Sequence, residues 1–295
     1  MLTSWRLPAK INWSLHVLGR RADGYHELRS WFVALSLCDR LVAVPGVSGP
    51  VQVTGEAAAG VPAGAANLVA AAEQSWRAAG GAAPPVRWLL EKRIPAGAGL
   101  GGGSSDAAGA LRALEHHASR ALGPEACAHL AAALGSDVPF FFSGADAELR
   151  GGRGEILLRR APVPRLRVAL AVPPFPVSTA AVYAAFAAGA VPGQLPADLA
   201  AESAAAAAAA ALPARPAGND LAAAAYRAFP ELARFAQRLA AFAPFQLSGS
   251  GGAHFAPLPE SGLDVAALRA ALPPGSRVLL TELQHGPVVA AQPSA

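Results

Sequence analysis

A glycine-rich segment between a strand pattern and a helix pattern constrains this chain more than any other feature. It reads Pro95-Ala-Gly-Ala-Gly-Leu-Gly-Gly-Gly-Ser-Ser-Asp-Ala-Ala108. The pattern at Val86–Lys92 predicts a strand before it, and Ser105–Ala118 is predicted to be a helix. Glycines let a backbone approach a ligand closely, and successive N–H groups at a helix N-terminus attract anions. The segment therefore predicts a polyphosphate site, where Ser104 and Ser105 cap the helix or donate hydroxyls to phosphate or a metal ion.

Two other glycine motifs and a flexible linker are the alternatives. The segment is not a P-loop, because no Gly-Lys-Ser/Thr sequence ends it. Gly97, Gly99 and Gly102 fit G-x-G-x-x-G, but no second strand ending in an acid follows about 20 residues later, as a dinucleotide fold requires. A linker would not normally connect a strand directly to a helix, so the polyphosphate site is favoured.

Composition and charge exclude several classes of protein. Hydrophobic residues make up 53% of the 295 residues and charged residues 15%, unlike a disordered chain. Cys38 and Cys127 are too few for a disulfide framework and too far apart for a zinc site. No stretch reads as a membrane span and no apolar signal segment begins the chain, so we expect a cytoplasmic protein without a membrane partner. The net charge of +4 comes from scattered arginines, so no nucleic-acid partner is expected.

Lysine and asparagine are scarce in this alanine- and arginine-rich chain, as coding bias would make them. The lysines are Lys10 and Lys92, and the asparagines are Asn12, Asn67 and Asn219. Each lies in or beside a segment that other features mark, so these five residues merit attention.

Strand and helix patterns alternate without the regular βαβ spacing of a parallel sheet, which favours an α+β protein of two domains. An arginine- and glycine-rich stretch around residues 145–165 suggests the domain junction, which we place between domains 1–160 and 161–295. Residues 188–215 are low in complexity and are interpreted as a loosely ordered insertion. Strands are predicted at 6–19, 30–44, 86–92, 167–173, 245–255 and 277–283, and helices at 65–79, 105–118, 124–134, 221–242 and 264–271.

Three segments together resemble the GHMP kinases, which are small-molecule kinases related to galactokinase, homoserine kinase and mevalonate kinase. They are Pro8-Ala-Lys-Ile-Asn12, the glycine-rich loop, and Leu247-Ser-Gly-Ser-Gly-Gly252. The segments Pro8–Leu28, Gly135–Phe141 and Val177–Tyr183 resemble, more narrowly, family members that act on a CDP-linked methylerythritol. Small departures are Ala98, where a further glycine is common, and Asp106, where Asn is frequent.

The resemblance implies an α+β, two-domain GHMP kinase fold. Its N-terminal domain would be like ribosomal protein S5 domain 2, and its C-terminal domain would be ferredoxin-like. It implies ATP at the glycine-rich loop, Mg²⁺ held mainly by phosphate oxygens, and the substrate between the domains. The implied reaction is phosphorylation of the 2-hydroxyl of the CDP-linked methylerythritol, in the non-mevalonate pathway to isoprenoid precursors. We expect a monomer or a weak homodimer.

Asp137 and Lys10 are the catalytic residues that the resemblance implies. A carboxylate that orients the attacking hydroxyl and takes its proton favours phosphoryl transfer to an alcohol. On the residues alone, Asp137 is equally well read as the cap of a helix that begins at Val138. Lys10 would hold the Asp137 carboxylate ionised and polarise the hydroxyl. The alternative for Lys10 is a surface position on a strand.

Tyr25 and His26 follow the turn at Asp23-Gly24, and an aromatic ring beside a polar ring suits a nucleobase. Tyr183 is the expected second face of a cytosine sandwich, with Phe175 as the competitor. The other substrate residues implied by the resemblance are Asn12, Thr179, Ser248, Gly249 and Gly251. The nucleotide residues implied are Asn67, Lys92, Pro95, Gly97, Gly99, Leu100, Gly101, Gly102, Gly103, Ser104 and Ser105, of which Ser105 is the one candidate ligand for the metal ion.

Three alternatives stay open at this point. Asn12 could be a buried strand residue satisfied by backbone, and the segment at 248–252 could be a plain turn. A GHMP kinase for another small alcohol would leave Gly24-Tyr-His-Glu27 unexplained. A nucleotide-binding protein without catalysis would have no need of Asp137 and Lys10.

Overall fold

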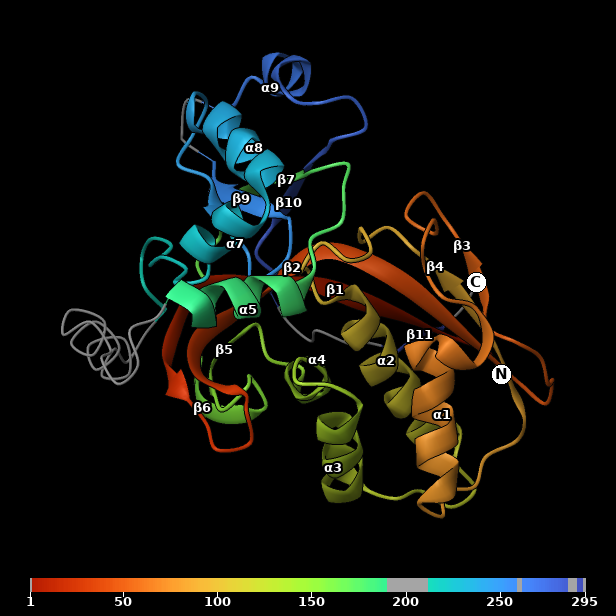
Figure 1. The fold of residues 1–295 in the computed structure, drawn as a ribbon. Coiled ribbons are helices and arrows are strands. Elements are labelled where there is room, and N and C mark those ends of the chain that lie inside the picture. The colour runs from red at the N-terminus through yellow and green to blue at the C-terminus, as the bar shows by residue number, and fades with distance from the viewer. Residues whose placement is uncertain (1, 190–211, 259–261, 286–290, 294–295) are drawn as a thin grey trace.

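A long antiparallel hairpin of β1 (Thr3–Arg20) and β2 (His26–Pro45) forms the centre of the molecule (Figure 1). The structure, a computed structural model, describes residues 2–189, 212–258, 262–285 and 291–293. Within these residues the hairpin belongs to a sheet in the order β11-β1-β2-β4-β3, with β5 paired to β2 and β6 to β5. The other strands of this sheet are β3 (Gln52–Thr54), β4 (Val86–Glu91), β5 (Ala147–Gly151), β6 (Ile156–Ala161) and β11 (Ala291–Pro293).

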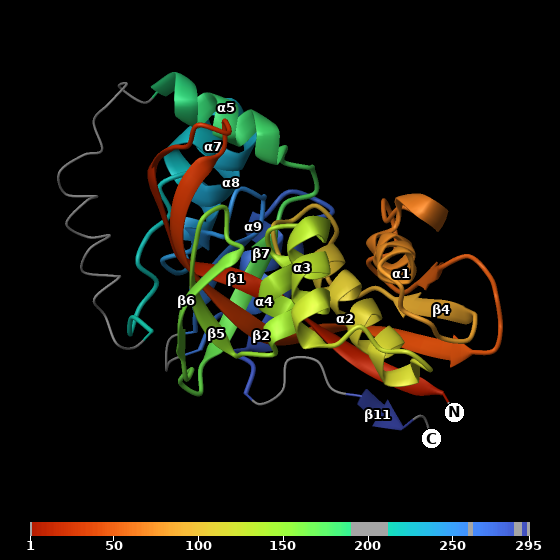
Figure 2. The same ribbon diagram turned by 90° about the horizontal axis from the view of Figure 1, so that it is seen from below.

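Helices cover one face of this sheet (Figure 2). Their core contains Trp76 and Phe140 from the helices and Trp88 from β4. Burying such large apolar side chains is the main favourable term in folding. The helices on this face are α1 (Leu68–Ala78), preceded by a 3₁₀ turn at Gly64–Ala66, α2 (Gly102–His117), α3 (Pro124–Leu134) and α4 (Val138–Ser143).

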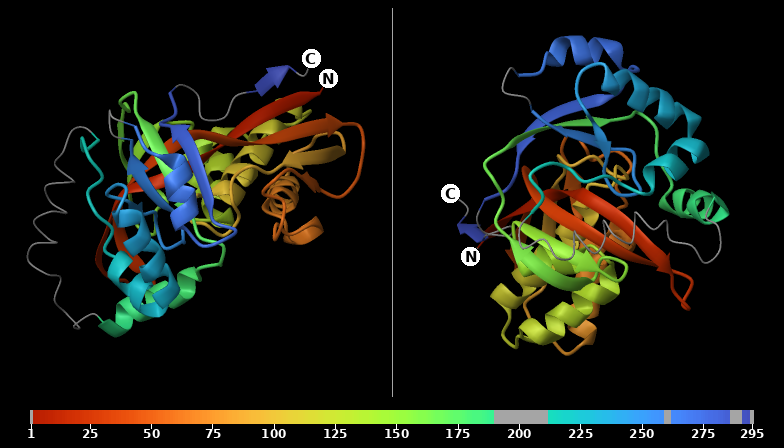
Figure 3. Two further views of the ribbon diagram at one scale, coloured as in Figure 1. Left: turned by 90° about the horizontal axis from the view of Figure 1, so that it is seen from above. Right: turned by 90° about the vertical axis from the view of Figure 1, so that its left-hand side faces the viewer.

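A second sheet, in the order β10-β7-β9-β8, lies on the other side of the hairpin (Figure 3). Ile11 and Trp13 of β1 share a core with Phe255 of this sheet. Its strands are β7 (Arg167–Val172), β8 (Gln246–Leu247), β9 (His254–Pro257) and β10 (Arg277–Glu282). The helices of this half are α5 (Thr179–Gly189), α7 (Ala222–Ala228), α8 (Pro230–Ala240) and α9 (Val265–Ala271).

A register shift in β1 decides which of its residues face the two cores. The pairing of β1 with β2 shifts between Pro8 and Lys10. Before the shift, Leu7 packs under the helices, and after it Ile11 packs on the second sheet. Side chains alternate along a strand, and irregularities of this kind re-aim them. Lys10 and Asn12 therefore face away from the second sheet.

The expected elements are largely present, with three corrections. The helix predicted at 221–242 is two helices, because Pro230 disfavours a helical conformation at Phe229, whose φ and ψ are −131° and 86°. The strand predicted at 245–255 is two short strands, β8 and β9, because the glycine-containing segment at 248–253 interrupts it. Helix α2 begins at Gly102 rather than Ser105, so the two serines lie inside it and its cap is the left-handed Gly101.

The boundary predicted between residues 160 and 161 falls at the end of β6, but β11 returns to the first sheet, so the division stays a prediction. Most of the low-complexity stretch, residues 190–211, lies outside the described residues. None of the helices described is both long and apolar enough to cross a membrane.

The first testable prediction concerns His254, which is buried between Tyr226 and the Gly252 carbonyl oxygen. Burial lowers its pKa to about 4, below the ordinary value near 6.5, although the Gly252 bond opposes the shift. The folded state then binds fewer protons than the unfolded state between these values, so stability is full above pH 6.5 and falls as the pH drops. We expect a loss of about 2 kcal/mol between pH 7 and 5 from this group. Urea unfolding of wild type and His254→Gln measures it, and an equal pH dependence in both would contradict it.

Candidate active site

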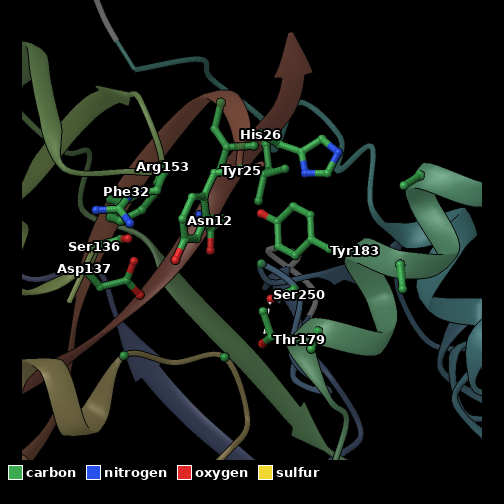
Figure 4. Close-up of a pocket in the computed structure, with 18 of the residues that line it drawn as sticks. Asn12, Tyr25, His26, Phe32, Ser136, Asp137, Arg153, Thr179, Tyr183 and Ser250 are labelled. Carbon is green, nitrogen blue, oxygen red and sulfur yellow. Dashed lines mark hydrogen bonds between the residues drawn. The ribbon is translucent and has the colours of Figure 1, made fainter. Parts of the chain in front are cut away.

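A cavity of about 720 Å³ lies between the β1–β2 hairpin and α5 (Figure 4). Its volume is in the range of small-molecule sites. Both halves of the molecule contribute residues to its wall. Those predicted from the sequence are Lys10, Asn12, Tyr25, His26, Gly99, Gly101, Asp137, Thr179, Tyr183 and Gly249.

Lys10 and Asp137 meet at the base of this cavity. The Lys10 Nζ lies 3.3 Å from Asp137 Oδ2 and donates to Asn12 Oδ1 at 2.8 Å. Lys10 is only 4% exposed, whereas the Asp137 side chain is 28% exposed. The lysine is therefore a fixed positive charge, and the carboxylate beside it is open to a ligand.

The backbone around Asp137 aims its carboxylate into the cavity. Asp137 is the N-cap residue of α4, and Pro139 lies at the start of the helix, where the missing N–H does no harm. The Asp137 side chain nevertheless accepts no capping hydrogen bond. Of the two readings left open by the sequence, the structure favours a carboxylate directed at Lys10.

Asn12 is oriented by three polar neighbours. Its amide nitrogen donates to Ser30 Oγ at 2.8 Å, and its backbone N–H donates to Ser248 Oγ at 3.2 Å. Its oxygen accepts from Lys10. This answers the alternative of a strand residue satisfied by backbone: Asn12 is buried, but side chains hold it.

Aromatic side chains form the other end of the cavity. Tyr25 is 54% exposed at the tip of the hairpin, and Figure 4 shows it across the cavity from Tyr183. The His26 ring stacks on Tyr183 with centroids 5.2 Å apart. Burial raises the pKa of Tyr183 to about 12, with a contribution from Asp137. Phe175 packs in a neighbouring core and does not line the cavity, so Tyr183 is the better second wall.

The glycine-rich loop lines a second cavity of about 380 Å³. Gly101, with φ of 72°, leads into the N-terminus of α2, so backbone N–H groups and the helix dipole face this cavity. Ser105 is fully buried and does not line it. The predicted nucleotide residues that do are Asn67, Lys92, Pro95, Gly97, Gly99, Leu100, Gly101, Gly102, Gly103 and Ser104.

The ammonium group of Lys92 is held inside the protein by two acids. It pairs with Asp39 and, at 2.6 Å, with Asp106 Oδ2. Burial alone would lower the pKa of Lys92, but the two carboxylates outweigh it and the pKa is raised. For Asp106 the effect of burial is the larger one: it raises the pKa of this carboxyl group to about 7, although the positive charge of Lys92 lowers it. Lys92 lines the second cavity, and the two carboxylates already compensate the charge of its ammonium group.

Asp39 also fixes the backbone that enters the glycine-rich loop. Its Oδ1 accepts hydrogen bonds from the N–H groups of Arg93 at 2.6 Å and Ile94 at 2.9 Å. No sequence pattern marks Asp39, since it follows Cys38 within an ordinary strand pattern. Arg153 was also missed: its guanidinium lies 4.6 Å from the Tyr25 ring centroid and lines the larger cavity.

The glycine-rich loop touches a second glycine-containing loop, Leu247–Gly252, and the residue that follows it. Ala253 N–H donates to the Ala98 carbonyl at 3.0 Å. A Cβ at Gly99 would lie 2.9 Å from Gly251 Cα and from the Ser248 carbonyl oxygen. Ser248 and Gly251, predicted as substrate residues, do not line the larger cavity and instead make this contact.

Ser105 is the one residue that the sequence suggested as a ligand for a metal ion. The described part of the chain contains no group of three His, Cys, Asp or Glu side chains arranged to hold a metal ion. The Ser105 hydroxyl has no hydrogen-bond partner, but it is fully buried. A divalent ion at this site would depend on the oxygens of a bound nucleotide.

Comparisons with known proteins agree with this geometry. A family model described as "GHMP kinases N terminal domain" matches residues 65–145, which contain the glycine-rich loop and Asp137. The galactokinase of Lactococcus lactis, at 13% identity and TM-score 0.60 over 98% of this chain and 95% of its own, has the same fold. The fold and the glycine cradle thus define a kinase of the GHMP class, and the expected α+β, two-domain architecture is confirmed.

Relatives with higher sequence identity show to which family within this class the chain belongs. The 4-diphosphocytidyl-2-C-methyl-D-erythritol kinase of Moorella thermoacetica is 42% identical over 84% of this chain and 88% of its own length. That of Pelotomaculum thermopropionicum is 47% identical over 62% of this chain, which spans 63% of that relative. A crystal structure of 4-(cytidine 5'-diphospho)-2C-methyl-D-erythritol kinase aligns with 95% of this chain and 99% of its own at TM-score 0.71 and 35% identity. The chain belongs to the family of 4-diphosphocytidyl-2-C-methyl-D-erythritol kinases.

The second prediction compares two glycines of the glycine-rich loop. Gly97 and Gly99 have φ of 68° and 83°, so alanine is strained at both, but only a Cβ at Gly99 meets other atoms within 4 Å. We expect Gly99→Ala to lower ATP affinity and turnover at least about tenfold, because it displaces the second loop, whereas Gly97→Ala has a much smaller effect. Calorimetry with ATP and steady-state kinetics measure both. Equal losses would mean that left-handed strain, not loop contact, is the cause.

Proposed function

We propose that the protein transfers the γ-phosphoryl group of ATP to the 2-hydroxyl of 4-diphosphocytidyl-2-C-methyl-D-erythritol. The observation that carries the proposal is the Lys10–Asp137 pair, which lies in one cavity with Tyr25, His26 and Tyr183. The wider family membership supports the kinase chemistry, and the aromatic end of the cavity supports a base-bearing substrate.

Asp137 is the group proposed to handle the proton. Its exposed carboxylate can accept a hydrogen bond from a substrate hydroxyl and take the proton as the oxygen attacks phosphorus. Lys10, 3.3 Å away, orients the carboxylate and places a positive charge where negative charge develops on the transferring group. Asn12 fixes the direction of the Lys10 ammonium group through its 2.8 Å hydrogen bond.

The nucleotide is proposed to bind with its phosphates on the N–H groups of the glycine-rich loop and the first turn of α2. Mg²⁺, carried on the phosphate oxygens, would supply neutralisation of phosphate charge. Ser104 lines this cavity and is the hydroxyl available to the phosphates, whereas the buried Ser105 is better suited to packing.

The cytosine base is proposed to lie between Tyr25 and Tyr183, with His26 at its edge. Burial, and then Arg20, lower the pKa of His26. A neutral imidazole has one donor and one acceptor nitrogen, so it can distinguish the donor–acceptor pattern of cytosine from that of uracil.

The third prediction tests Asp137 as the general base. Asp137→Asn preserves shape but removes the proton acceptor, so turnover should fall by about 10²–10⁴-fold while ATP and CDP still bind. Steady-state assays with calorimetry of both ligands measure this. Turnover near the wild-type rate would reject Asp137 as the base, and loss of both binding events would indicate misfolding.

The fourth prediction tests the substrate. Tyr25→Ala should weaken binding of CDP by about 1–3 kcal/mol, the usual contribution of one base–aromatic stack. ATP binding should be unchanged, because the nucleotide cavity is lined by other residues. Calorimetry with each ligand decides the matter. If wild type fails to bind CDP at millimolar concentration, the cytidine assignment is wrong and a kinase for another small alcohol becomes the better account.

A further inference from the structure

Asn219 is the one asparagine that the functions above leave unexplained. It precedes α7 in the second half of the chain, and every hydrogen-bonding atom of its amide is used. Its Nδ2 donates to the carbonyl oxygens of Leu247 at 2.9 Å and Gly249 at 2.7 Å. Its Oδ1 accepts from the Leu221 N–H at 3.0 Å. Asn219 therefore joins the start of a helix to the second glycine loop, Leu247–Gly252.

That loop lies against the residues proposed to act on the hydroxyl. Ser248 Oγ accepts from the backbone N–H of Asn12. Gly249, with φ of 61°, is so near that a Cβ on it would lie 2.9 Å from Asn12 Oδ1 and 3.8 Å from Lys10 Nζ. The two carbonyls that Asn219 binds belong to the Leu247–Ser248 and Gly249–Ser250 peptides, so the amide fixes one peptide plane before and one after the Ser248–Gly249 peptide.

The same loop also lies against the glycine-rich loop, through Gly251 and Gly99. A third contact joins Ser250 Oγ to Thr179 Oγ1 at 3.0 Å, at the start of α5. One short segment thus lies against Asn12 and Lys10, against the glycine-rich loop and against Thr179 on the far side of the larger cavity. A shift of this segment would change their separation.

We infer that Asn219 is a positioning residue for phosphoryl transfer, which acts by holding the Leu247–Gly252 loop between the nucleotide and the Lys10–Asp137 pair; this rests on the proposed function. It touches neither ligand site itself, since Asn219 lines neither of the two cavities described above. Because a misplacement of about 1 Å can lower a rate by about 10²-fold, its loss reduces turnover more than binding.

The test is Asn219→Asp. The carboxylate keeps the shape and the acceptor for Leu221 N–H, but it brings negative charge to two carbonyl oxygens in place of two donors. We expect kcat to fall about 10–100-fold, while the dissociation constants for ATP and CDP change less than about threefold. Hydrogen exchange of the amides in residues 247–253 should become faster. Asn219→Ala, which adds no charge, should show the same pattern if the aspartate variant does not fold.

The matched control is Asp264→Ala, which removes the N-cap bond to Ala267 N–H, 2.9 Å long, in the same half of the molecule. This control should lower the melting temperature about as much as the Asn219 variants do, but it should leave kcat and hydrogen exchange in the Leu247–Gly252 loop unchanged. A wild-type kcat in both Asn219 variants, equal losses in kcat and binding, or unchanged loop exchange would each overturn the inference. Absence of wild-type turnover on the CDP-linked substrate would instead reject the proposed function, and loop exchange would still report on Asn219.

Discussion

Contact between two backbones, with no room for side chains, holds the halves of the site together. Ala98 and Gly99 of the glycine-rich loop lie against Gly251 of the Leu247–Gly252 loop and against Ala253, which follows that loop. On its other side the glycine-rich loop is bonded to β1, where Lys10 N–H donates to the Leu100 carbonyl at 2.9 Å. The spacing between the glycine-rich loop and Lys10 is therefore set by contacts between main-chain atoms.

Local chemistry made part of this arrangement predictable from the sequence. The glycine-rich segment indicated a phosphate cradle, because few other uses exist for so many glycines between a strand and a helix. The turn at Asp23-Gly24 likewise indicated a hairpin, and β1 and β2 form it. Asp137 and Lys10 were joined only through a family resemblance. Their separation in the chain carries no physical signal that they meet.

Other features could not be predicted, because they depend on tertiary neighbours. Lys92 lines the cavity at the glycine-rich loop, but its pairing with Asp39 and Asp106, which come from two other elements, could not be predicted. The arginines and glycines around residue 150 likewise gave no sign that Glu148 is buried and pairs with Arg150 of the same strand. Buried ion pairs reward geometry rather than local sequence, and sequence patterns do not report geometry of this kind.

The partners of β1 have a consequence for the order in which the molecule is made. The inner half of this strand bonds to late parts of the chain: Trp13 O accepts from Ala217 N–H, and Asn12 N–H donates to Ser248 Oγ, 236 positions on. At the usual pace of synthesis, that interval lasts on the order of 10–50 s. During it, the nascent strand presents unpaired groups of the kind that invite aggregation. Contacts between residues so far apart in the chain slow folding, and the larger cavity cannot be complete before residue 250 has been made.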